Sequence, residues 1–187
     1  MKLVRRLIRG ALDLLFGREN ISPPRIPRIN IPRFVLQRLM RLTRPTTGRV
    51  EPLALAVVRY ASEDAQDVVV VVDCIAFADE AYVDGLAGTN FDTRWLMSIA
   101  NSRAASNSGL LLVHCHDGTG KPAFSAIDRK TNNEGMATLA VGMTTIPYGA
   151  LVLSSDDYYA IVTMDGGLTP ARVMIVPDAG GRLDLSA

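Results

Sequence analysis

The sequence predicts an α+β fold, a curved and mixed β-sheet flanked by helices, and three observations lead to this class. Short apolar runs rich in β-branched residues outnumber the segments with helical spacing, so strands are expected to dominate. Segments with helical spacing also occur, so helices are expected beside the sheet. The chain has 187 residues, of which 48% are hydrophobic, which is enough for one packed domain with an extension to spare.

The N-terminal segment is expected to form an extension outside this domain. Residues 2–16 carry apolar side chains at the i, i+3, i+4, i+7 spacing of an amphipathic helix, and Gly17 would end it. Four prolines in residues 18–33 exclude a helix there and favour extended chain. Arginines interrupt the apolar run, so a signal peptide is not expected. The helix would dock on protein or lie on a membrane surface, and we expect docking on protein.

The charge is distributed unevenly along the sequence. Residues 1–50 hold twelve basic and two acidic residues, so this arm carries +10, while the acidic remainder carries −9.

The body is expected to contain, in order, a short edge strand at 29–31, a helix at 34–42, strands at 52–61 and 68–76, a helix at 93–106, and strands at 110–116, 138–143, 149–153, 158–164 and 172–176. Asp92 is a good N-cap for the second helix, and residues 172–176 would add an edge.

The two cysteines, Cys74 and Cys115, are too few for a disulfide framework, so a reducing cytosol is the expected compartment. No apolar run approaches the roughly 20 residues that a membrane-spanning helix needs. The sequence therefore predicts a cytoplasmic protein.

The two histidines of the sequence, His114 and His116, lie one residue apart at the end of a predicted strand. Side chains at i and i+2 share a face of a strand, so both imidazoles would project together and Cys115 would point away. A glycine-rich loop could then return Asp128 to them. Two histidines and a carboxylate leave a fourth tetrahedral position for water, as in catalytic zinc sites. The alternatives are histidines that bond to backbone at a strand end and an Asp128 that only caps a helix.

The motif HCHDGTGKPAFSAID, residues 114–128, resembles the signature of the JAB/MPN (JAMM) metalloproteases: His-x-His, a short loop, then Ser-x-x-Asp. The likeness covers roughly residues 29–165. Asp117 stands where the family usually has proline, and the loop before Ser125 is one residue longer than usual. The stretch around Glu51 lacks the glycine-rich strand common in the family.

The resemblance implies a cytidine-deaminase-like JAB/MPN fold, with an extension over residues 1–28, a catalytic domain over 29–165 and a tail over 166–187 that is able to add an edge strand. It implies that His114, His116 and Asp128 hold Zn²⁺. It also implies that Glu51 is the general base and that Ser125 stabilises the oxyanion.

By the same resemblance, the activity would be cleavage of the peptide or isopeptide bond after the C-terminus of a ubiquitin-like protein. Bacterial members commonly accompany such a protein with activating and conjugating enzymes, including in antiphage operons. Two alternatives stay open: a catalytically silent MPN-type scaffold, and a RadC-like nucleic-acid-associated protein that uses the basic arm. The arm has no aromatic stacking platform, so nucleic acid is not the expected partner.

Overall fold

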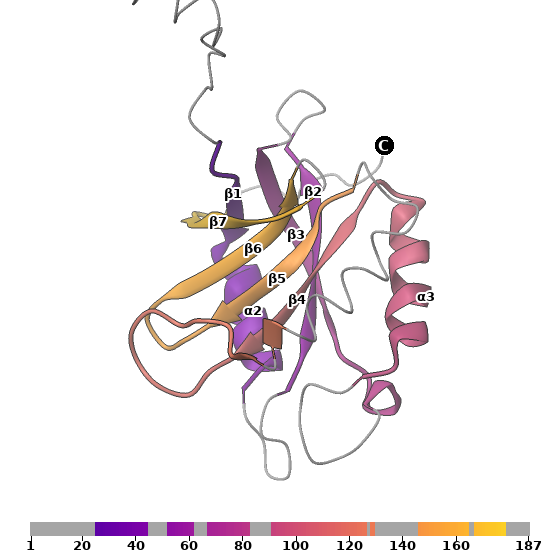
Figure 1. Cartoon of the computed structure of the whole chain (residues 1–187), viewed down its shortest axis with the longest axis horizontal. Helices are drawn as coiled ribbons and strands as arrows, with labels where there is room; N and C mark the ends of the chain where they lie inside the picture. Colours follow the sequence, from indigo (N-terminus) through magenta and orange to yellow (C-terminus); the bar gives the residue numbers. More distant parts are fainter. Residues whose placement is uncertain are drawn as a thin grey trace, which may run out of the picture.

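The computed structural model describes residues 25–44, 52–61, 67–82, 91–126, 128–129, 146–164 and 167–178. Their elements are β1 (Arg28–Pro32), α2 (Arg33–Leu42), β2 (Ala54–Tyr60), β3 (Val68–Ala76), the 3₁₀ turn η1 (Asp79–Ala81), α3 (Thr93–Ala104), β4 (Gly109–Cys115), β5 (Tyr148–Leu153), β6 (Tyr158–Met164) and β7 (Gly167–Val176). The strands form a closed barrel in the order β1-β3-β2-β4-β5-β6-β7 (Figure 1).

The predicted fold class was wrong, because the sheet closes on itself instead of forming the helix-flanked curved sheet of the JAB/MPN fold. Closure comes from β1, which pairs in parallel with β3 on one side and with β7 on the other, in a register from Arg28 opposite Arg172 to Pro32 opposite Val176. Both strands were expected to be edges. Alternation along a sequence identifies a strand but not its partner, so this pairing between distant segments had no local signal.

Two hydrophobic cores lie on opposite faces of the barrel wall. The inner core takes buried or partly buried residues from all seven strands, together with Val35, Leu36 and Leu39 of α2. The outer core covers part of the wall and includes Leu96 and Ala100 of α3. Figure 1 shows α3 standing apart on one flank, whereas α2 lies behind the strands β4 to β6. Each helix therefore packs on a different face of the same sheet.

Strand β4 lies inside the sheet, between antiparallel β2 and parallel β5. Ala54, the first residue of β2, lies opposite Val113, and Cys115 at the end of β4 lies opposite Leu153. The backbone N–H of His116 continues this pairing by donating to the Leu153 carbonyl at 2.9 Å. The end of β4 that carries both histidines is thus fixed by the start of β2 and the end of β5.

Helix α3 begins as the sequence predicts. Asp92 is its N-cap, and the Asp92 carboxylate accepts a hydrogen bond of 2.8 Å from the backbone N–H of Arg94. Trp95 in the first turn packs against Phe77, with ring centroids 4.5 Å apart. The helix is therefore attached to the barrel by aromatic as well as aliphatic contacts.

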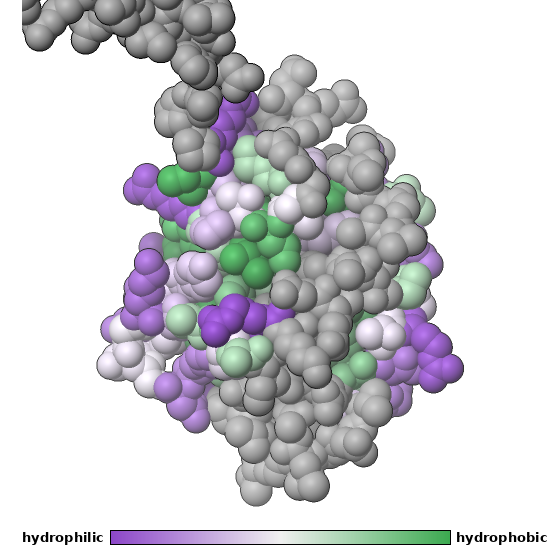
Figure 2. Space-filling model, in the orientation of Figure 1, coloured by the Kyte–Doolittle hydropathy of each residue, from purple (hydrophilic) through white to green (hydrophobic). Residues whose placement is uncertain are grey.

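The surface in Figure 2 shows a small apolar patch over β5 and β6, with hydrophilic side chains of the described residues around it. Large apolar side chains that are exposed include Ile26, Phe34, Met97 and Met174. Among the described residues no helix has both the length and the apolar character needed to span a bilayer. The helix expected over residues 2–16 and the strand expected over 138–143 lie outside the described residues.

Candidate metal centre

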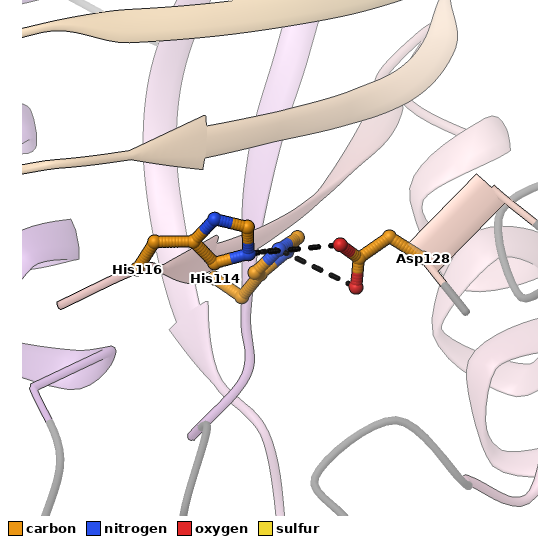
Figure 3. A group of neighbouring side chains, drawn as sticks. All are labelled: His114, His116 and Asp128. Carbon is orange, nitrogen blue, oxygen red and sulfur yellow. Dashed lines mark hydrogen bonds and ion pairs between the residues drawn. The ribbon is translucent and has the colours of Figure 1, made fainter. Parts of the chain in front are cut away.

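His114 stands on the outer face of β4, and His116 directly follows the last residue of that strand. Side chains two residues apart on a strand point to the same face, so His114 shares a face with Leu110 and Leu112. Both leucines belong to the outer core. The Nε2 atoms of His114 and His116 lie 3.0 Å apart, and Figure 3 shows the two rings turned toward Asp128. The Cys115 side chain packs against the inner core instead. Strand alternation alone therefore brings two imidazole nitrogens to one point.

Asp128 reaches this point from the first turn of a short helical segment. Ser125 caps that turn: its hydroxyl oxygen accepts the backbone N–H of Asp128 at 3.1 Å, and its own backbone N–H donates to Asp128 Oδ2 at 2.6 Å. This reciprocal arrangement resembles a capping box and holds the carboxylate in one orientation. Asp128 Oδ1 lies 3.6 Å from His114 Nε2, and Oδ2 lies 3.6 Å from His116 Nε2. The carboxylate thus presents one oxygen to each ring.

The geometry of these three side chains fits a metal ion. In a tetrahedral zinc site with ligand distances of about 2.0–2.1 Å, ligand atoms lie roughly 3.3–3.4 Å apart, and the separations of 3.0, 3.6 and 3.6 Å surround that value. His114 and Asp128 are each 4% exposed, while His116 is partly exposed. A buried carboxylate is unfavourable without a cation beside it. The group of His114, His116 and Asp128 could therefore bind a metal ion.

The protonation states also suit metal binding. Burial lowers the pKa of His114 to about 4, and the charge on His116 acts in the same direction, whereas Asp128 opposes the shift. Burial would raise the pKa of Asp128, but the hydrogen bonds from Ser125 and the neighbouring imidazoles bring this pKa below its ordinary value. Near neutral pH, His114 is therefore neutral and Asp128 ionised, which are the forms that coordinate metals.

The lowered pKa of His114 predicts a pH-dependent stability of the metal-free protein. The ordinary pKa of 6.5 applies in the unfolded state, and the folded value is about 4. The unfolded state therefore binds more protons between these pH values, so the free energy of unfolding falls as the pH drops from 6.5 to 4, by about 3 kcal/mol. Urea unfolding of chelator-treated protein at several pH values measures this fall. The variant His114→Gln should lack most of this fall in the free energy of unfolding. If the free energy of unfolding depended on pH in the same way in both proteins, the fall could not be attributed to His114.

The loop between His116 and Ser125 is held by the turn between β5 and β6. Asp156 Oδ1 accepts the backbone N–H of Gly120 at 2.6 Å, and the buried hydroxyl of Ser154 donates to the Gly120 carbonyl at 2.8 Å. Ser155 donates to the Gly118 carbonyl at 2.7 Å. Gly118 and Gly120 have φ values of 122° and 91°, which glycine adopts without strain. Sequence reasoning missed these contacts, because the turn residues that follow the LVL run indicate a turn but not its distant partner.

Substitution of Asp156 should weaken metal binding without removing a ligand. Asp156→Ala leaves the backbone N–H of Gly120 without its acceptor and loosens the loop that leads to Asp128, although the bonds from Ser154 and Ser155 remain. We expect a loss of metal affinity of about 5-fold, because one hydrogen bond with a net value of about 1 kcal/mol is removed from the loop. Competition with a chromogenic chelator measures the affinity. Ser102→Ala, at an exposed α3 serine whose hydroxyl donates to the Ile99 carbonyl of the same helix, is the matched control; equal affinities in both variants would contradict this role.

The remaining residues singled out by the sequence have the following places. Ser125 is exposed beside Asp128, and its hydroxyl hydrogen is not used by the bond from the Asp128 N–H. Burial, followed by the charge of Asp117, raises the pKa of the Cys115 thiol, which makes it a poor nucleophile. Glu51 lies outside the described residues. The described residues that follow it, Pro52 and Leu53, lead into β2, whose first residue pairs near the histidine end of β4.

Comparisons with known proteins add no assignment. No protein-family profile matches the sequence, and no curated protein matches it. A similar solved structure is the solution structure of protein DSY2949 from Desulfitobacterium hafniense, which has 12% sequence identity and a TM-score of 0.46 over 81% of the present protein and 95% of that one. Values this low carry no argument about function.

Proposed function

We propose that the protein is a zinc-dependent hydrolase that cleaves an amide bond. The observation that carries the proposal is the convergence of two imidazole nitrogens and one carboxylate at a buried strand end, with His116 on the accessible side. Three protein ligands of this kind are typical of catalytic zinc, which keeps one coordination position open, whereas structural zinc is held by four. Zinc fits these borderline nitrogen and oxygen ligands better than the harder Ca²⁺ or Mg²⁺.

Each residue of the site would have a separate role in the reaction. A bound zinc ion would supply Lewis acidity and would lower the pKa of a water molecule bound to it to about 7. Glu51 would accept a proton from the attacking water and return it to the leaving amine. Ser125, through its hydroxyl hydrogen, would stabilise the oxyanion that develops on the carbonyl. The Ser125–Asp128 hydrogen bonds would keep this donor and the metal-binding carboxylate in a fixed relation.

For the substrate we propose the C-terminal tail of a ubiquitin-like protein, cleaved from its conjugate in a cytoplasmic conjugation system with its own activating and conjugating enzymes. The support is the spacing of His114, His116, Ser125 and Asp128, which resembles the JAMM signature. The barrel fold does not contribute to this argument. An extended tail is also the form of substrate that a site at a strand end can accept alongside the sheet.

The test is cleavage by the zinc-loaded, full-length protein of ubiquitin-like proteins whose C-terminal glycine carries an amide-linked fluorophore. We expect turnover that is lost on treatment with a chelator and restored by zinc. Turnover unchanged by the removal of metal would contradict the proposed chemistry. A zinc-loaded protein that cleaves no di-glycine tail would contradict the proposed substrate.

A further inference from the structure

A cavity adjoins the candidate metal centre at His116. This pocket of about 410 Å³ lies at the end of the barrel beside α2, and His116 belongs to its lining. Met40 and Cys115 form a half-buried floor that packs against the inner core. The volume falls in the range of small-molecule sites, about 300–1,000 Å³. The pocket therefore has room for a side chain or a short peptide end next to the metal-binding group.

The lining of this pocket is positively charged. Arg41 in the last turn of α2 and Arg44, two residues past the end of that helix, both line it, against the single carboxylate of Asp117. Neither guanidinium has a carboxylate partner among the residues that the structure describes, whereas Arg38, one turn earlier, donates to Asp73 at 3.1 Å. Arg41 donates a long bond of 3.4 Å to the Gln37 carbonyl. Two neighbouring guanidiniums over an apolar floor are suited to a planar anion.

We propose that this pocket binds a carboxylate group carried by the substrate close to the bond that is cleaved at the metal, with Arg41 and Arg44 as the recognising residues. Arginine binds carboxylates through two parallel N–H···O bonds, which fixes orientation as well as charge. Because His116 is shared, the carboxylate would lie within a residue or so of the reacting amide. The substrate class is thus an amide with a neighbouring carboxylate, either the C-terminus of a peptide or an acidic side chain. The placement of the cleaved bond at the metal rests on the proposed function, whereas binding of a carboxylate by Arg41 and Arg44 does not.

The test measures binding separately from turnover. The Nε–Hε signals of Arg41 and Arg44 are followed by NMR in the full-length protein, with and without zinc, during titration with three probes. These are N-acetylglycylglycine, its C-terminal amide, and N-acetylglutamylglycine amide, which moves the carboxylate to a side chain. We expect the arginine signals to shift with the first or the third probe, which identifies the source of the carboxylate, and not with the second. The shift should occur without zinc as well, because the proposed ligands are arginines.

Variants distinguish recognition from a structural role. Arg41→Gln and Arg44→Gln should each weaken binding of the carboxylate probe about 10-fold, the effect of one lost charge-assisted pair of hydrogen bonds. Arg38→Gln on the same helix should leave it unchanged. Arginines near a helix C-terminus also stabilise the helix, and a role of that kind alone would lower the melting temperature of each variant without changing probe binding.

Equal binding of the acid and the amide probes would overturn the inference, and so would binding that requires zinc and is indifferent to Arg41 and Arg44. Failure of the proposed function gives a different result: arginine-dependent carboxylate binding would persist in a protein that hydrolyses nothing. The two outcomes are therefore distinguishable in one set of samples.

Discussion

Replacing Asp128 with asparagine is expected to reduce zinc affinity by about 100-fold or more. Structural zinc sites gain about 10–16 kcal/mol from four ligands, so one charged ligand contributes roughly 3 kcal/mol, and each 1.4 kcal/mol is a factor of ten. The asparagine keeps the size of the side chain and an oxygen that can accept the Ser125 N–H, so the helical turn should persist. The expected loss is therefore specific to coordination. Calorimetric titration of the chelator-treated protein with zinc measures it.

The melting temperature provides an independent test of the same variant. A ligand that binds only the folded state stabilises it in proportion to the logarithm of its concentration over the dissociation constant. Zinc should therefore raise the melting temperature of the unmodified protein. At the same zinc concentration the rise should be smaller for Asp128→Asn, by up to about 2.7 kcal/mol of stabilisation for a 100-fold weaker site. His116→Ala should show a reduced rise as well. Asp117→Asn, which removes an exposed carboxylate two residues from the end of β4, is the matched control and should keep the full rise. A zinc-dependent rise of equal size in all of these proteins would contradict the ligand assignment.

Replacing Glu51 with glutamine is expected to abolish turnover while zinc binding is retained. Proton transfer by a positioned general base and acid contributes about 10²- to 10⁴-fold to rate, and glutamine can neither accept nor return the proton. The value of kcat should therefore fall by that factor, with one zinc ion still bound per molecule. Steady-state kinetics and metal analysis on the same preparation measure both quantities. Glu80→Gln, at an exposed position in η1, is the control for loss of a carboxylate. Turnover unchanged in Glu51→Gln would remove this residue from the reaction.

The histidine end of the site was predictable from the sequence because its geometry is local. Alternation along a strand needs no tertiary information, and it placed His114 and His116 on one face and Cys115 on the other. The bounds of β3 and the N-cap of α3 were predictable for the same reason, since β-branched runs and capping residues act within a few positions. The cap of the turn at Asp128 was predicted differently: Asp128 itself was the expected capping residue in one alternative, whereas Ser125 performs this role.

What the sequence could not supply were pairings between distant segments. Nothing in the local pattern of β1 or β7 indicates that they lie side by side and close the barrel. Likewise, the turn after β5 shows its turn-forming residues, but not that Asp156 and Ser154 hold Gly120 some 35 residues away. Arg41 and Arg44 are ordinary surface arginines in the sequence, and only the packing of α2 at the end of the barrel brings them next to His116. Each of these depends on tertiary structure that a sequence window does not contain.

We expect His114, His116 and Asp128 to hold one metal ion, which anomalous diffraction from zinc-loaded crystals would locate. One strong zinc peak per molecule should lie about 2.0–2.2 Å from both Nε2 atoms and from a carboxylate oxygen of Asp128. A map that shows these three side chains without a zinc peak between them, although zinc was present during crystallisation, would contradict this expectation.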